Sequence, residues 1–532
     1  MIETPTFGFA AVAAPHLAAA EAGQVVLAQG GNAVEAMVAM AATVAVVYPH
    51  MNGLGGDGFW LVREPGGRLH GLDASGPAGA LATIKRYQAK GYHEVPPRGP
   101  DAAVTVPGAV GGWRLALELA RSLGGQMPLD LLLGDAIRWA REGCPVSQSE
   151  GRYVLKEAQA LQAAPGFAEV FFVDGKRPEA GTLRRQPALA ATLERLAHVG
   201  LRDFYRGDVG REIAADLERL ESPVTRRDLE TYEARVVQPL SMRRGPAQIV
   251  NLPPPTQGLA SLLILGIAGR LEAARTDTAD LHHGLIEATK RAYAIRDRVV
   301  TDPRHLTKDP AAFLENSVLE REAAAIDARR AAPFPLPPPA DGDTIWMGAI
   351  DERGLAVSYI QSLFWEFGSG CVLPGTGVLW SNRGRGFSLD PRSLNPLEPG
   401  RKPFHTLNPA LAVFDDGRVL SYGTMGGEGQ PQVQAQIFTR YADLGLGLAE
   451  AVDAPRWLLG RAWGAQAATL KVEDRFDPEI IDRLARRGHA IEEIGQPYAD
   501  ALGHAGMLVK HRRDGRVEAT HDPRSDGGAL GL

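Results

Sequence analysis

Apolar residues recur with two different spacings along this 532-residue chain, and the change between them marks its organisation. From Trp113 to about Ala234 they recur mainly every three or four residues, which is typical of amphipathic helices. After residue 330, short apolar segments are separated by glycine-rich turns, which predicts strands. Because strand follows strand in hairpins and does not alternate with helix, the pattern predicts a layered α/β sandwich and not a doubly wound sheet.

The same periodicities give ranges for individual elements. Helices are predicted over residues 16–29, 33–47, 113–123, 129–142, 150–163, 186–198, 209–220, 226–234, 259–269, 281–297, 431–444, 448–453 and 478–487. Strands are predicted over residues 7–14, 59–63, 69–73, 247–252, 345–350, 355–361, 370–381, 406–414, 418–424, 469–472, 490–494, 505–511 and 517–521. The helix over 33–47 is rich in Ala and Val on nearly every side, so we expect other elements to enclose it.

Composition narrows the function classes. Hydrophobic residues make up 45% of the chain, which is ample for a core, and the formal net charge is only −6. Long basic runs are lacking, so binding to nucleic acid or to an acidic membrane has no support and a small-molecule enzyme is favoured. The two cysteines, Cys144 and Cys371, provide neither a disulfide framework nor a metal set, and we expect buried thiols in a reducing compartment.

The N-terminal residues and the longest apolar run bear on localisation. The first residues show no basic segment followed by an apolar one, so we expect a cytoplasmic protein. The apolar run over 33–47 is shorter than the roughly 20 residues that span a bilayer, and it contains Glu35. No membrane association is therefore predicted.

Two motifs are candidates for binding a cofactor, and both have simpler explanations. The glycine-rich segment 53–58 follows a helix and precedes a strand, the reverse of the order in nucleotide-binding loops, so close backbone packing is the better explanation. His283 and Glu287 lie four residues apart on a predicted helix, which suits a metal, but the sequence offers no evident third ligand. We expect a surface or interlayer pair there, and neither a metal nor an organic cofactor.

The segment from Asp341 to Asp351 brings a proline-rich loop to Thr344, which begins the predicted strand 345–350. A threonine at this position can simply be a good strand former. Alternatively, the chain is cut between Asp343 and Thr344, and the new α-amino group of the threonine activates its own hydroxyl as a nucleophile. These residues alone leave both explanations open.

Four separated blocks resemble the γ-glutamyltranspeptidase family of N-terminal-nucleophile hydrolases, and their order matches over essentially the whole chain. The blocks are residues 30–36 with 49–56, residues 253–258 (Pro-Pro-Pro-Thr-Gln-Gly), residues 341–344 and residues 423–427 (Gly-Thr-Met-Gly-Gly). The resemblance implies a four-layer αββα sandwich made as one precursor that cleaves itself before Thr344. It also implies a large subunit of residues 1–343 and a small catalytic subunit of residues 344–532.

The resemblance also assigns roles in catalysis. Thr344 would be the nucleophile, and its freed amine, with an ordinary pKa of about 8, would serve as general base. Ser362 stands where the family usually has a threonine that contacts this amine. The backbone N–H groups of Gly426 and Gly427 would stabilise the oxyanion. Phe364 replaces an asparagine of the family, which makes the pocket more aromatic.

Other departures from the family pattern concern the substrate. Ser75 stands where the family has an arginine that binds the substrate α-carboxylate, and Arg383 stands where a glutamine binds its ammonium group. Gly386 replaces an aspartate, and a pair of serines becomes His405-Thr406. A guanidinium in place of ammonium acceptors favours a plain carboxylate as ligand. We expect Arg383 in the pocket, and leave Arg385 open between the pocket and the surface.

Several phrases after residue 366 resemble the oxamate amidohydrolase branch of the family, so oxamate or a similar small carboxylate-bearing amide is the expected substrate. They are residues 367–370, 379–384, 403–409, 425–432 and 503–506. Two alternatives stay open: a glutathione or γ-glutamyl hydrolase or transpeptidase, and an uncleaved, inactive member of the family with a binding role. The expected partners are the small amide and the two subunits of the same precursor, which can form a dimer of cleaved heterodimers.

Overall fold

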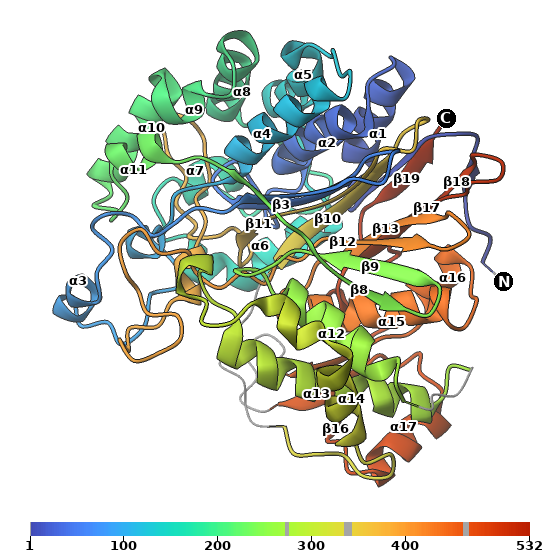
Figure 1. Cartoon of the computed structure of the whole chain (residues 1–532). Helices are drawn as coiled ribbons and strands as arrows, with labels where there is room; N and C mark the ends of the chain where they lie inside the picture. The colour runs from blue at the N-terminus through green and yellow to red at the C-terminus, as the bar shows by residue number, and fades with distance from the viewer. Residues whose placement is uncertain (1, 272–275, 335–342, 461–467) are drawn as a thin grey trace.

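The computed structural model describes residues 2–271, 276–334, 343–460 and 468–532. Two seven-stranded sheets lie face to face at the centre, and helices cover the outer side of each sheet (Figure 1). This four-layer αββα arrangement confirms the predicted fold class. Among the described helices, none combines the length and the apolar character needed to cross a membrane.

The first sheet contains the predicted nucleophile. Its strand order is β19 (Gly528–Gly531), β2 (Ala11–Ala14), β10 (Asp343–Ile350), β11 (Ala356–Phe364), β3 (Asp57–Arg63), β4 (Leu69–Ala74) and β7 (Arg235–Val237), and all neighbours are antiparallel. The turn between β10 and β11 is closed by Asp351, whose carboxylate accepts a hydrogen bond from the Leu355 N–H at 3.0 Å. Gly354 supplies the positive φ of 86° that this tight turn requires.

The second sheet has the strand order β1 (Thr6–Phe7), β18 (Val517–His521), β17 (Ala505–Lys510), β13 (Val419–Thr424), β12 (Ala410–Phe414), β9 (Ala247–Asn251) and β8 (Leu240–Arg244). Apolar side chains from both sheets fill the space between them, with Trp346 and Phe59 from the first sheet meeting Leu411 and Leu508 from the second. This inner layer holds the two sheets in a fixed relation, and the site lies at one end of it.

Helices from the first half of the chain cover the first sheet, and later helices cover the second (Figure 1). The first group comprises α1 (Leu17–Ala28), α2 (Ala33–Val47), α4 (Ala109–Ser122), α5 (Leu129–Glu142) and α8 (Pro187–Val199), and the second comprises α12 (Gly258–Ala268), α13 (Ala279–Val299), α15 (Gln430–Ala442) and α16 (Leu448–Asp453). Every residue of α2 is buried, as its uniformly apolar sequence predicts. A capping box between Asn32 and Glu35 begins this helix.

The remaining elements are short or peripheral. They are the helices α3 (Ile84–Ala89), α6 (Gln148–Leu161), α7 (Phe167–Phe171), α9 (Asp203–Arg206), α10 (Asp208–Arg219), α11 (Arg226–Thr231), α14 (Asn316–Ala324) and α17 (Pro478–Arg486), a small sheet of β14 (Trp457–Gly460), β15 (Thr469–Val472) and β16 (Ile491–Glu493), and the pair β5 (Cys144–Pro145) and β6 (Leu183–Arg184). Cys144 and Cys371 are both buried free thiols, as predicted from the sequence.

Some predicted elements are wrong, and each has a physical reason. The expected strand 370–381 is absent from this described segment, where tight turns leave only isolated bridges, between Val372 and Leu379 and between Trp380 and Gly55. The strand 7–14 is divided between the two sheets as β1 and β2. Helix α4 begins four residues before Trp113 and includes Gly111 and Gly112, although glycine is a poor helix former. The helix extends over these glycines because they allow close packing against Tyr232 and Ala74.

Candidate active site

Thr344 and Ser362 lie side by side at one end of the first sheet. Asp343 pairs with Phe364 and Ile345 with Gln361, so the register shifts by one residue at Thr344 and places it opposite Ser362. The Thr344 hydroxyl donates a hydrogen bond to Ser362 Oγ at 3.2 Å, and both residues are almost fully buried. Residues 341 and 342 and the Asp343 side chain lie outside the described part of the chain, so the predicted cleavage site is described from Thr344 onward.

The glycine-rich segment before β3 packs directly against this pair. A Cβ atom on Gly56 would lie 2.2 Å from the Ser362 carbonyl oxygen, and one on Gly55 would lie 2.2 Å from the Leu379 carbonyl oxygen. Only glycine permits such approaches, which confirms close backbone packing as the reason for these residues. Asp57, the first residue of β3, pairs with Ser362 on β11. Its carboxylate therefore lies one strand away from Ser362, which contacts Thr344.

The turn at Gly426 and Gly427 lies beyond the end of β13, near the start of β10. Trp346, two residues after Thr344, packs on Gly423 so closely that a Cβ there would lie 2.2 Å from its indole ring. Gly426 and Gly427 have φ values of 114° and 49°, a backbone path that favours glycine. The Gly429 N–H donates to the Gly426 carbonyl at 2.7 Å. Because that carbonyl shares one planar peptide with the Gly427 N–H, the bond directs this N–H to the opposite side.

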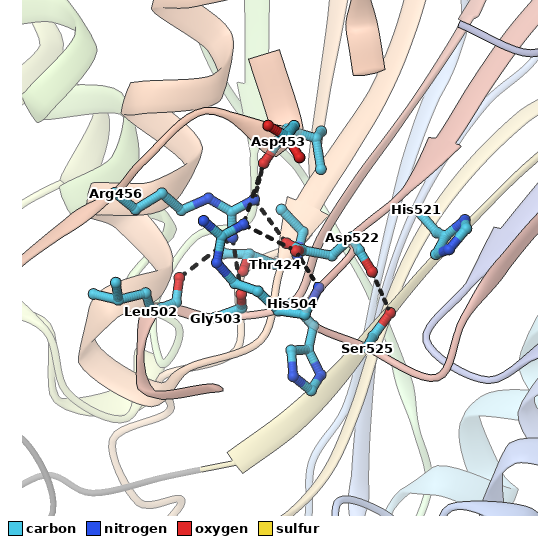
Figure 2. A network of polar contacts seen from close by, with 12 residues as sticks. Thr424, Asp453, Arg456, Leu502, Gly503, His504, His521, Asp522 and Ser525 are labelled. Atoms are coloured by element: carbon cyan, nitrogen blue, oxygen red, sulfur yellow. Dashed lines mark hydrogen bonds and ion pairs between the residues drawn. The ribbon is translucent and has the colours of Figure 1, made fainter. Parts of the chain in front are cut away.

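A buried ionic network supports the glycine turn from behind, through Gly503 (Figure 2). Arg456 donates to the Gly503 carbonyl at 2.8 Å and pairs with Asp522 at 2.7 Å. The adjacent His504 carbonyl accepts the Met425 N–H at 3.1 Å. A Cβ on Gly503 would lie 2.6 Å from Thr424 Oγ1 and 2.7 Å from the Met425 carbonyl, so the two turns are in tight contact.

Arg383 is buried beside the predicted nucleophile's strand, and its guanidinium is poorly paired. Its carbon Cζ lies 4.0 Å from the centre of the Phe364 ring. Its Nη1 reaches Thr406 Oγ1 at a long 3.5 Å, whereas Nε and Nη2 have no hydrogen-bond partner among the described residues. Burial lowers the pKa of Arg383 to about 9, opposed by Asp57, so the group is charged at neutral pH.

Two further titratable groups surround this guanidinium. Burial raises the pKa of Asp57 to about 7, although Arg383 and the Gly76 N–H oppose the shift. Burial, with Arg383 and Lys402 nearby, holds the pKa of His405 well below its ordinary value, so the imidazole is neutral. His405 Nε2 lies 3.9 Å from Asp57 Oδ2, and within the described residues neither of these atoms has a hydrogen-bond partner. Buried polar atoms without partners are costly, so this group is suited to receive a polar ligand.

Other predicted site residues have definite places. The Phe364 N–H donates to Ser362 Oγ at 2.8 Å, and Phe364 has a positive φ of 85° that turns its ring toward Arg383. The Ser75 hydroxyl donates to Asp73 at 2.6 Å. Arg385 bonds the Val95 carbonyl at 2.7 Å and Glu94 at 2.8 Å, so its charge is already paired, unlike that of Arg383.

Sequence reasoning missed two residues of the site. Asp57 lies in the glycine-rich segment for which the sequence predicts only close packing, although a carboxylate at the start of a buried strand is rare and could have indicated a functional role. Gln257 follows the three prolines of the second block, and its carboxamide reaches the carbonyls of both Thr406 and Gly427, at 2.7 and 2.8 Å. Nothing in the local sequence indicates contacts across 149 and 170 residues.

His283 and Glu287 have a third potential metal ligand that the sequence did not reveal. Possible ligand atoms of His283, Glu287 and His489 lie within 4.8 Å of one another. The contacts within the cluster are already complete, because the two imidazoles share a hydrogen bond of 2.8 Å and Glu287 pairs with Lys290 at 2.6 Å. Burial, together with Lys290, lowers the pKa of His489 to about 3, so this imidazole is neutral.

Comparison with known proteins places this site in a family. A Klebsiella pneumoniae protein named oxamate amidohydrolase proenzyme is 50% identical over 97% of both chains, and a Bacillus subtilis protein named glutathione hydrolase-like YwrD proenzyme is 37% identical over 98% of both. The crystal structure of cephalosporin acylase from Bacillus halodurans superposes with a TM-score of 0.91 at 32% identity, covering 100% of this chain and 97% of that one. The family model described as Gamma-glutamyltranspeptidase matches residues 19–532. The chain is therefore an enzyme of the gamma-glutamyltranspeptidase family.

Proposed function

We propose that this chain, a self-processing amidohydrolase of its family, hydrolyses a short amide that bears a plain carboxylate, with oxamate as the substrate. The observation that carries the proposal is the buried guanidinium of Arg383, which has two nitrogens without partners among the described residues. A substrate carboxylate could accept two charge-assisted hydrogen bonds from these nitrogens. The relative named as an oxamate amidohydrolase, at 50% identity, supports this choice.

Self-processing generates the nucleophile. The Thr344 hydroxyl attacks the Asp343 carbonyl, the peptide becomes an ester, and water hydrolyses that ester to leave residues 1–343 and residues 344–532 as two subunits. The freed amine of Thr344, with an ordinary pKa of about 8, then accepts the proton of its own hydroxyl. Ser362 accepts a hydrogen bond from the Thr344 hydroxyl at 3.2 Å and thereby orients that hydroxyl.

Hydrolysis then proceeds in two steps. The Thr344 oxygen attacks the amide carbon of oxamate, and the Gly426 and Gly427 N–H groups stabilise the oxyanion. The Thr344 amine then returns its proton to the leaving nitrogen, the C–N bond breaks, and ammonia departs. Water attacks the resulting oxalyl ester and releases oxalate. Phe364, His405 and Thr406 line the small pocket, and Ser75 contributes by fixing Asp73 beside Lys402. Apart from Asp57, whose pKa of about 7 leaves it partly protonated at neutral pH, the lining is aromatic, neutral or cationic, and it suits an anion better than the ammonium group of an amino acid.

Substrate specificity tests the proposal directly. We expect ammonia release from oxamate and little cleavage of γ-glutamyl-p-nitroanilide. Strong cleavage of the γ-glutamyl substrate without oxamate turnover would overturn the assignment in favour of a glutathione-type hydrolase.

A denaturing gel tests the nucleophile separately. The purified protein should give two fragments, ending and beginning at the 343–344 bond, and Thr344→Ala should give a single uncleaved chain without activity. One band for both proteins would contradict self-processing at this bond.

A further inference from the structure

Gln257 occupies a buried position between the two parts of the proposed site. Its side-chain nitrogen donates to the Thr406 carbonyl at 2.7 Å and to the Gly427 carbonyl at 2.8 Å, and the residue is 0% exposed. Thr406 carries the hydroxyl that contacts Arg383, and Gly427 carries one of the proposed oxyanion donors. One carboxamide therefore joins the segment that would bind the carboxylate to the turn that would bind the reacting carbonyl.

The orientation of this carboxamide is determined by its neighbours. Arg296 Nη1 donates to Gln257 Oε1 at 3.0 Å, and since arginine has no acceptor, the opposite end must be the NH₂ group. Both of its hydrogens are then used by the two carbonyls. Arg296 is itself held by Glu428 at 3.2 Å and by the face of Tyr293, whose ring centre is 3.9 Å from its Cζ. These contacts therefore permit only one orientation of the Gln257 carboxamide.

The backbone of Gln257 anchors the same segment. Its N–H donates to the His405 carbonyl at 2.9 Å, and the His405 N–H donates to the Pro255 carbonyl at 2.9 Å. The main chain thus aligns the 405–406 segment, while the side chain spans from it to Gly427. Without the two N–H donors of the Gln257 side chain, the backbone hydrogen bonds would still hold the 405–406 segment in place. The distance between this segment and the turn at Gly427 would no longer be fixed.

We propose that Gln257 is a positioning residue that sets the spacing between the carboxylate-binding and oxyanion-binding parts of the site, and thereby selects the shortest amides. The inference rests on the proposed function. In oxamate the carboxylate carbon is bonded directly to the amide carbon, so its two anchoring points must be close. Malonamate has one methylene more and needs a longer spacing. A displacement of about 1 Å can lower the rate on the order of a hundredfold. If the Gln257 contacts are lost and the spacing varies, the rate with oxamate should therefore fall most.

The test compares oxamate and malonamate in three variants and the wild type. Gln257→Met removes both donors at similar volume, and Gln257→Glu keeps the shape and the Arg296 contact while setting a carboxylate against two carbonyls. The matched control is Gln436→Met. Gln436 is equally buried, donates to the Gln432 and Trp457 carbonyls at 3.2 and 3.0 Å, and accepts the Trp457 N–H at 3.2 Å.

We expect both Gln257 variants to lower the ratio of kcat/KM for oxamate to that for malonamate about tenfold or more. Gln436→Met should leave this ratio within about twofold, whatever it does to the melting temperature. A parallel loss on both substrates, with the ratio unchanged, overturns the positioning role and leaves the proposed function intact. A wild-type protein inactive toward both amides overturns the proposed function, and the inference with it.

Discussion

Arg456 and Arg383 are both fully buried and positively charged, but they differ in how many hydrogen-bond and ion-pair partners their guanidinium groups have. The guanidinium of Arg456 pairs with Asp522 at 2.7 Å and donates to the carbonyls of Val452 and Gly503 at 2.6 and 2.8 Å (Figure 2). Within the described part of the chain, the Arg383 guanidinium makes one hydrogen bond, a long one of 3.5 Å to Thr406. Removing a cation from water costs several kcal/mol unless new partners replace the water. The protein provides these partners for two nitrogens of Arg456, whereas under the proposed function a substrate carboxylate would provide them for Arg383.

The nearby carboxylates show the same contrast. Burial raises the pKa of both, but Arg456 and Arg524 reverse this for Asp522 and lower its pKa to about 2. For Asp57 burial dominates over Arg383, and its pKa is raised to about 7. Asp522 is therefore a permanent counterion, whereas Asp57 is close to half protonated at neutral pH. A carboxylic acid that is partly neutral competes weakly with an incoming anion for the guanidinium.

The largest expected effect comes from removing the paired arginine. Arg456→Met leaves Asp522 and Arg524 without a member of their network, so the free energy of unfolding should fall by about 3–5 kcal/mol. Urea denaturation of the cleaved protein measures this difference. A loss below about 1 kcal/mol would show that the network does not stabilise the turn at Gly503.

Removing the unpaired arginine should affect catalysis and spare stability. Arg383→Met should lower kcat/KM for oxamate about 100-fold or more, which corresponds to about 3 kcal/mol, because the substrate carboxylate loses its charged partner. The free energy of unfolding should stay within about 1 kcal/mol or rise, since the variant deletes a buried and poorly paired charge. Equal kcat/KM in the variant and the wild type would exclude Arg383 from substrate binding.

The difference between these arginines also marks the limit of sequence reasoning here. The layered fold, the helix over 33–47 and the strand over 345–350 follow from local periodicity, and the blocks around residues 344 and 423–427 predict the nucleophile and the glycine turn. The family-like segment around Arg383 predicts that this residue lies in the pocket, and the sequence does not decide between pocket and surface for Arg385. Only the three-dimensional contacts show that Arg385 is paired with Glu94 and Arg383 is not. Asp57 and Gln257 contact residues more than 100 positions away in the sequence, and no local pattern predicts such contacts.

Asp57 predicts a pH dependence of stability. Its folded-state pKa of about 7 lies above the ordinary value near 4, so between these pH values the folded protein holds a proton that the unfolded chain has released. This contribution favours folding at low pH and is lost as the pH rises through 7. Relative to Asp57→Asn, the wild type should lose up to about 1.4 kcal/mol per pH unit between pH 5 and 7, measured by urea denaturation. Parallel stability profiles for the two proteins would contradict the raised pKa.

The smallest expected effect concerns the ring beneath Arg383. A desolvated cation–π contact contributes about 1–2 kcal/mol, so Phe364→Leu should raise KM for oxamate by about five- to thirtyfold, because the guanidinium is held less firmly. The matched control is Tyr498→Leu, which removes a similar contact to Arg475, 3.9 Å from Cζ to the ring centre, on an exposed side chain. It should leave KM unchanged.

A double variant decides whether Phe364 acts through Arg383 or independently. If the ring only orients the guanidinium, then adding Phe364→Leu to Arg383→Met should cost almost nothing further in kcat/KM, because the group it orients is gone. Additive losses would mean that Phe364 contacts the substrate itself. In that case the pocket would hold its anion by shape as well as by charge, and the contrast between Arg383 and Arg456 would explain only part of the specificity.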